Sequence, residues 1–165
     1  MIDRYLKALT SAIVGLMATL YVAHNLVNAD KAYAFFAYTA SHADQEVYPI
    51  TLLPVLPPFM VVAAMVLVFG LEIAAGVFCL LGGWTLWRAR GADKAGFAAA
   101  KRWTKIGCGC ALANWWGLFQ GVAVAGYQLW QKPLGESPFY GSFFFGAIAM
   151  TVLIYVSMTE GESAG

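Results

Sequence analysis

Glu72 needs a chemical explanation first, because it is a carboxyl group inside a long run of apolar side chains. An ionised carboxylate at the centre of a membrane costs at least about 2.5 kcal/mol, so such a group is expected to be neutral or paired. The small residues Ala75 and Gly76 follow Glu72 at helical spacing. They indicate that Glu72 points into a helix bundle, where we expect it to be protonated and hydrogen-bonded.

Two amide side chains of another apolar run, Asn114 and Gln120, are the expected partners of Glu72. When depth in the membrane is counted from the cytoplasmic end of each run, at about 1.5 Å per residue of helix, Glu72 lies between the depths of Asn114 and Gln120. Three roles for Glu72 stay open at this point. It could fix the register of the helices, act as a proton relay, ion relay or ligand contact, or touch a partner subunit. A relay normally uses several such groups, and the apolar runs hold one carboxylate.

His24 and Asn25 lie near the end of the first apolar run, where a histidine could be hydrogen-bonded at the membrane interface or touch a quinone. A haem held by two histidines needs a second one facing His24. The other histidine, His42, falls in a predicted loop, so we expect no haem. The cysteines are interpreted as small buried hydrophobic residues, since they lie in apolar runs: Cys79, Cys108 and Cys110. No catalytic set, metal cluster or cofactor site can be assembled.

Composition places these residues in a membrane protein. Apolar residues make up 61% of the 165 residues and charged residues 12%, and the mean hydropathy is +0.67. Soluble domains carry about 25% charged residues. The net charge of +1 argues against nucleic acid as a partner. The length fits a single transmembrane domain, 1–165, and no cleavable signal peptide is evident.

Four apolar runs are long enough to cross a bilayer as helices, which takes roughly 20 residues. They are 5–27, 59–86, 104–129 and 139–159, and they predict an all-α four-helix bundle. The connection 28–58 is the longest piece outside the runs. Its first part predicts a short helix in the membrane interface, begun by Asn28 or Asp30 as a cap. Its second part holds four prolines between Pro49 and Pro58 and is expected to be extended.

The distribution of Lys and Arg predicts how the bundle is oriented, because basic residues gather on the cytoplasmic side. Eight of the ten basic residues fall at the amino terminus or around the connection between the second and third runs: Arg4, Lys7, Arg88, Arg90, Lys94, Lys101, Arg102 and Lys105. Only Lys31 and Lys132 fall on the other side. Both termini are therefore predicted to be cytoplasmic.

Small residues at helical spacing predict where the helices touch, because glycine lets backbones approach closely in lipid. Gly76 lies on the Glu72 side of the second run. Gly107, Gly117 and Gly121 lie along one side of the third run, together with Asn114. We expect these two sides to pack against each other.

The sequence also resembles a family of small bacterial inner-membrane proteins of unknown function. The residues that carry the resemblance are His24-Asn25-Leu26-x-Asn28, Ala-Tyr-Ala-Phe-x-Ala-Tyr at 32–38, Val47-Tyr48-Pro49, Leu71-Glu72-x-x-Ala75-Gly76, Gly83-x-x-Leu86-Trp87-Arg88-Ala89-Arg90, Ala99-Ala100-Lys101-Arg102-Trp103 and Leu129-Trp130-Gln131. The resemblance covers nearly the whole chain. It implies a four-helix protein of the bacterial inner membrane and implies no reaction.

Three functions are consistent with these observations. A non-catalytic accessory subunit or assembly factor, which binds other membrane proteins, is the first interpretation, because the bundle is small and lacks a catalytic set. A small transporter or channel that uses Glu72, working as a homo-oligomer, is the second. A quinone- or haem-associated redox protein is the third. An internal cavity that reaches Glu72 would favour transport, and a filled bundle with a flat aromatic face would favour the subunit.

Overall fold

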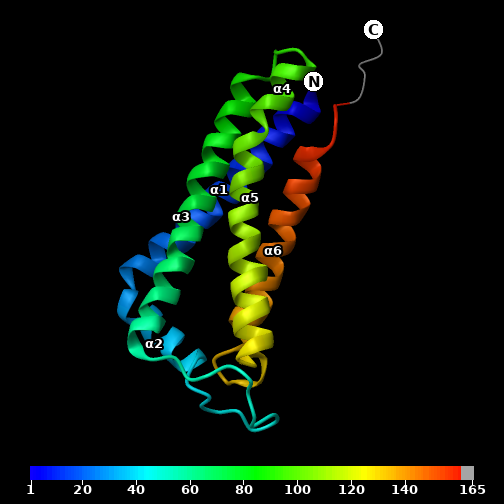
Figure 1. Ribbon diagram of the computed structural model, residues 1–165. Coiled ribbons are helices and arrows are strands. Elements are labelled where there is room, and N and C mark those ends of the chain that lie inside the picture. The colour runs from blue at the N-terminus through cyan, green and yellow to red at the C-terminus, as the bar shows by residue number, and fades with distance from the viewer. Residues whose placement is uncertain (161–165) are drawn as a thin grey trace.

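The computed structural model describes residues 1–160, so the last five residues of the predicted domain 1–165 lie outside the described part. The fold is all-α, as predicted. In chain order its helices are α1 (Ile2–Val27), α2 (Ala29–Thr39), α3 (Pro58–Arg88), α4 (Lys94–Ala100), α5 (Arg102–Leu112), the π-helix η1 (Ala113–Gly126), the 3₁₀-helix η2 (Leu129–Gln131) and α6 (Glu136–Ser157). Figure 1 shows the N terminus beside α4 at one end and α2 at the other.

Three of the helices, α1, α3 and α6, are long and apolar enough to cross a membrane. They coincide with the first, second and fourth apolar runs to within a few residues. The third run is divided between α5 and η1, so neither part reaches that length by itself. Backbone at the junction stays right-handed helical, and Figure 1 shows α5 and η1 as one uninterrupted rod between α3 and α6.

Tight contact between α1, α3 and α5 forms the centre of the fold. A Cβ atom on Gly15 of α1 would lie 2.7 Å from the backbone nitrogen of Leu80 in α3. A Cβ on Gly107 of α5 would lie 2.7 Å from the nitrogen of Cys79. The Ser11 hydroxyl donates to the Cys79 carbonyl over 2.7 Å. Glycine at these points allows the close backbone approach that stabilises helix pairs in lipid. Gly76 faces Thr19 and Gly15 of α1, so its predicted contact with the third run is wrong, because that side of α3 is already occupied by α1.

Gly117 and Gly121 are exposed on the outside of the bundle, so their predicted packing against α3 is wrong. The reason is the winding of η1. Its hydrogen bonds run from residue i+5 to residue i, as from the Tyr127 amide to the Val122 carbonyl at 2.9 Å. Each turn then holds more than four residues instead of 3.6. Residues seven apart, such as Asn114 and Gly121, therefore fall on different sides.

The connection between α1 and α3 lies against the bundle instead of standing apart from it. In α2, Phe36 packs on Val22 and Val68, and its ring meets that of Phe119 with centroids 6.5 Å apart. Lys132 donates to the carbonyls of Tyr38 and Thr39, the last residues of α2, over 3.0 and 2.9 Å. A cation at a helix C-terminus is favourable there. Residues 40–57 form no helix or strand.

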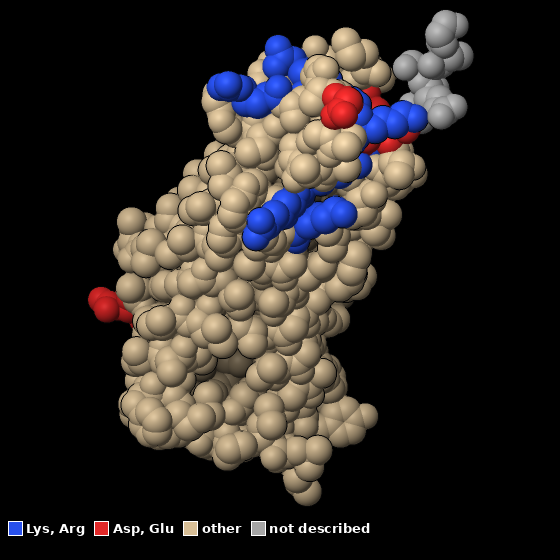
Figure 2. All heavy atoms as spheres, turned by 45° about the horizontal axis from the view of Figure 1, so that its top comes forward, with Lys and Arg blue, Asp and Glu red and all other residues tan. Residues whose placement is uncertain are grey.

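The opposite end of the molecule carries a cluster of buried charges. Lys7 and Lys101 each donate to the carbonyl of Met158 and lie 2.8 Å from the same carboxylate oxygen of Glu160. Burial alone would raise the pKa of Glu160, but the hydrogen bonds from Lys101 and Lys7 outweigh it and lower the pKa to about 2. Figure 2 shows the Lys and Arg side chains gathered in this half and an almost uncharged surface, with a hollow, in the other.

Candidate functional site

Glu72 lies near the middle of α3 and is 3% exposed, so it points into the bundle. The Asn25 amide, from the last turns of α1, donates to its Oε2 over 2.9 Å. The Asn114 amide, from the first turn of η1, reaches its Oε1 over a longer 3.4 Å. Three helices thus place polar groups at one point inside an otherwise apolar bundle, and each oxygen of the carboxyl faces an amide.

Gln120 does not reach Glu72, although its depth suggested it could. Its amide instead donates to the Phe139 carbonyl and the Ser142 hydroxyl of α6, over 2.6 and 2.8 Å. These bonds hold η1 against α6. The Asn114 side-chain oxygen has no hydrogen-bond partner among residues 1–160, although Asn114 is fully buried. A buried amide oxygen without a partner is uncommon, because it loses its hydrogen bonds to water without replacement.

A cavity of about 490 Å³ leads to Glu72 from the half of the bundle that contains α2. The ends of α1 and α6 and the face of α2 form its mouth, and α3 and η1 form its inner wall. Its lining residues are Tyr21, His24, Asn25, Asn28, Lys31, Ala32, Phe35, Phe36, Val68, Glu72, Trp115, Phe119, Ser137, Pro138, Gly141, Ser142 and Phe145. We call it the Glu72 cavity. Its polar residues lie mainly at the mouth, and Glu72 is the carboxyl group within it.

Aromatic rings make up much of the wall of the Glu72 cavity. Tyr21, Trp115 and Phe145 form a group in mutual contact, with ring centroids 4.5 to 6.5 Å apart. Phe36 and Phe119 meet edge to face on another side. The lining of the cavity therefore holds six aromatic rings from α1, α2, η1 and α6, together with the carboxyl group of Glu72 from α3.

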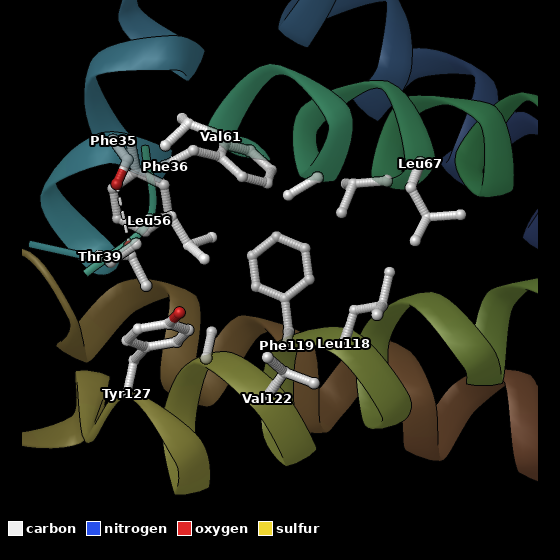
Figure 3. A pocket seen from close by; sticks show the side chains of 14 residues that line it. Phe35, Phe36, Thr39, Leu56, Val61, Leu67, Leu118, Phe119, Val122 and Tyr127 are labelled. Carbon is white, nitrogen blue, oxygen red and sulfur yellow. Dashed lines mark hydrogen bonds between the residues drawn. The ribbon is translucent and has the colours of Figure 1, made fainter. Parts of the chain in front are cut away.

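A second, smaller pocket of about 100 Å³ lies directly behind Phe36 and Phe119. Its lining is almost wholly apolar, from α2, α3 and η1. Figure 3 shows the ring of Phe119 projecting from η1 into this pocket, between the side chains of α3 and those of α2. Phe35, Phe36, Val68 and Phe119 line both pockets. A change in the Phe36 or Phe119 rotamer would therefore change both volumes.

The two histidines are not brought together. His24 is exposed at the mouth of the Glu72 cavity, whereas the His42 ring nitrogen lies 2.7 Å from the Leu53 carbonyl in the 40–57 segment. Within residues 1–160 no group of three His, Cys, Asp or Glu could hold a metal ion. Cys79 and Cys108 are buried with their sulfur atoms 4.0 Å apart, and Cys110 is half-buried.

Sequence reasoning missed the aromatic wall and the part that α2 plays in it. Trp115 and Phe119 are spaced four residues apart, a pattern that also fits an ordinary packing face. The signal that could have distinguished a cavity wall from a packing face is the pairing of Trp115 with Tyr21 of α1. The α2 aromatics Phe35 and Phe36 were expected at the membrane interface, and they line both pockets.

Comparison with known proteins shows that the sequence matches one protein family. Residues 3–159 match the family described as "Predicted small integral membrane protein (DUF2165)". The match covers nearly the whole chain, so the protein belongs to this family of integral membrane proteins, which confirms the resemblance seen in the sequence. Neither a curated protein nor a solved structure matches the chain.

Proposed function

We propose that the protein binds a small molecule in the Glu72 cavity and belongs to the class of small membrane transporters. The observation that carries the proposal is the cavity of about 490 Å³ that ends at a buried carboxyl group in the middle of α3. Ligand sites are concave, mostly apolar and equipped with a few convergent polar groups. A purely structural carboxyl would be expected in a filled interface instead.

The proposal includes four membrane crossings with both termini in the cytoplasm of a bacterial cell. Three helices have the required length and apolarity, and α5 with η1 together exceeds the roughly 20 residues of a crossing. An even number of crossings would leave α1 and α6 with their free ends on the same side. That side holds Arg88, Arg90 and Lys94, in keeping with the cytoplasmic preference of basic residues. The Glu72 cavity then opens toward the outer side.

A second candidate function is the accessory subunit or assembly factor. The observation in its favour is the row of exposed apolar side chains in the outer connection, where Ile50 is 81% and Leu52 97% exposed. Val47 and Tyr48 continue the row. Such residues can anchor a partner or lie in the membrane interface. The Glu72 cavity has no role in that function, which is why we place it second.

The proposal is tested by thermal unfolding of the purified protein with three benzyl probes: benzyltrimethylammonium, phenylacetate and benzyl alcohol. A ligand that binds only the folded state raises the melting temperature. Gly141 lines the cavity, and a Cβ there would make an ordinary contact with Phe145 at 3.6 Å, so we expect Gly141→Leu to reduce the volume of the cavity. Gly109→Leu is the matched control, because that site has open space around it.

At least one probe is expected to stabilise the parent and Gly109→Leu, and to lose its effect in Gly141→Leu. If no probe stabilises the parent, or if Gly141→Leu responds as the parent does, the cavity is not the binding site. In that event a partner protein that is retained through native purification would support the accessory-subunit function.

A further inference from the structure

We propose that the ligand of the Glu72 cavity is an organic cation of the quaternary ammonium type, and that it exchanges for the proton of Glu72. This inference rests on the proposed function and gives it a substrate class. It is carried by the position of the Glu72 carboxyl in a cavity lined by aromatic rings, and by the absence of a second acid among the described residues that line the cavity.

The aromatic wall favours a cation over other ligands. The face of an aromatic ring is negative, and rings arranged around a quaternary ammonium group recognise it without hydrogen bonds. Tyr21, Trp115 and Phe145 form a group of contacting rings in the cavity wall, and Phe119 lines the same cavity. A cation in the cavity would share it with the carboxyl of Glu72, which supplies the countercharge. An anion would meet the same carboxyl and the same ring faces unfavourably.

The neutral surroundings of Glu72 favour its protonated form. The two groups that reach its oxygens, Asn25 and Asn114, are neutral amides, and no basic side chain lies within ion-pair distance of it in the described chain. A protonated carboxyl can donate one hydrogen bond. The Asn114 oxygen can accept it if that amide is turned over, since the two amide orientations differ only in which atom is called O and which N. In that orientation the Asn114 oxygen accepts from Glu72, and the amide nitrogen takes the position that has no partner.

Exchange then needs no further reactant. The O–H bond of Glu72 breaks as the cation arrives, and its proton leaves to water at the mouth of the cavity. The cation neutralises the carboxylate that remains. The net charge inside the bundle is therefore zero both before and after the exchange. Release of the cation reverses each step, with a proton taken up from water. One proton is displaced for one cation bound.

The titratable groups that face this site come from two neighbouring helices. Tyr21 and His24 lie on α1, and Lys31 lies on α2 at the mouth. The lining residues from η1 and α6 carry no titratable group. Lys31 is exposed, so water screens its charge from a ligand near Glu72. His24 is the group whose titration must be separated from that of Glu72, and His24→Gln serves this purpose.

The experiment measures binding and proton release together, in weakly buffered detergent solution with a pH indicator. The probes are choline, benzyltrimethylammonium and the neutral alcohol in which carbon replaces the nitrogen of choline. We expect at least one of the two cations to bind with release of about one proton, and its affinity to rise about tenfold per pH unit while Glu72 is protonated. Glu72→Gln, which keeps the hydrogen bonds, should abolish the proton release and the pH dependence. His24→Gln should leave both in place.

Three outcomes would overturn the inference. Binding of a cation without proton release would remove the exchange. Equal binding of choline and its neutral analogue would remove the cation preference, while the proposed small-molecule site would stand. Proton release that persists in Glu72→Gln but disappears in His24→Gln would assign the proton to the histidine. If none of the probes binds here and none stabilises the protein in the thermal assay, the proposed function fails together with the inference.

Discussion

Asn25, in the last turns of α1, donates a hydrogen bond of 2.9 Å to Glu72, in the middle of α3. The bond joins two helices that also touch through Gly15 and Gly76, and it lies just beyond the end of that close contact. Soon after Asn25, α1 ends and α2 begins, and residues of both helices line the Glu72 cavity. The pair therefore marks the boundary between a tightly packed half of the bundle and a hollow one.

Replacement of Asn25 by Ala is expected to lower the free energy of unfolding by about 1 kcal/mol, because a buried carboxyl oxygen loses its donor. Asn28→Ala is the matched control. The Asn28 amide is exposed and bonds only to the His24 carbonyl one turn earlier on its own chain. Thermal unfolding of both variants in detergent makes the comparison. Equal melting temperatures for the two would show that the bond from Asn25 to Glu72 contributes nothing.

Two glycines of the same rod should respond differently to a large side chain. Gly107→Leu places atoms against Cys79 at the contact between α3 and α5, where overpacking costs roughly 1–3 kcal/mol. Gly121→Leu adds a side chain on the outside of η1, where a Cβ would lie 3.5 Å from the Trp116 carbonyl oxygen of the same helix. We expect Gly121→Leu to melt near the parent. Strong destabilisation by Gly121→Leu would mean that the third helix winds as a regular α-helix and packs through that side.

The buried charge cluster at the basic end should give a pH dependence. The pKa of Glu160 is lowered from an ordinary value of 4.5 to about 2, so its carboxylate stabilises the fold above pH 4.5. That contribution is lost as the pH falls from 4.5 toward 2. Glu160→Gln should lower stability at neutral pH and weaken the pH dependence in this window. Glu46→Gln, an exposed residue of the outer connection, should do neither. Parallel pH profiles for Glu160→Gln and the parent would contradict the assignment.

The orientation can be tested with cysteines on the two ends, in a chain whose native cysteines are replaced by alanine. A cysteine at Asp93, the cap of α4, is expected to be shielded from an impermeant thiol reagent in intact cells. A cysteine at Asp44, in the 40–57 segment, is expected to be labelled. Disruption of the cells should expose the Asp93 site. Labelling of that site in intact cells would reverse the orientation and open the Glu72 cavity to the cytoplasm.

Much of this fold follows from the sequence, because the bilayer imposes strong conditions on composition and length. Apolar runs predict the long helices, and small residues predict the contact of Gly107 in α5 with α3, whereas Gly76 faces Thr19 of α1 instead of the third run. Glu72 was expected inside the bundle with an amide donor, since a carboxyl at that depth needs one. The structure has Asn25 and Asn114 in that position. Depth alone could not decide whether Asn114 or Gln120 bonds to Glu72, and in the structure it is Asn114.

What the sequence did not predict depends on two departures from regular geometry. The first is the π-helical winding of η1, which moves Gly121 to the outside and turns Phe119 toward α2. The sequence pattern was interpreted with 3.6 residues per turn, which does not apply to a π-helix. The second is the position of α2, which lies against α3 and closes one side of the cavity. Nothing in the spacing of Phe35 and Phe36 distinguishes contact with α3 from contact with lipid headgroups.

The central claim is that a water-accessible cavity reaches Glu72, and reactivity of a cysteine at that position tests it most directly. Methyl methanethiosulfonate reacts with the thiolate, which forms only where water has access. Ala75, about one turn further along α3 and fully buried in the packed half, provides the control. In a chain without native cysteines, we predict modification of Glu72→Cys and none of Ala75→Cys. Equal rates at the two positions, or no reaction at either, would contradict the cavity.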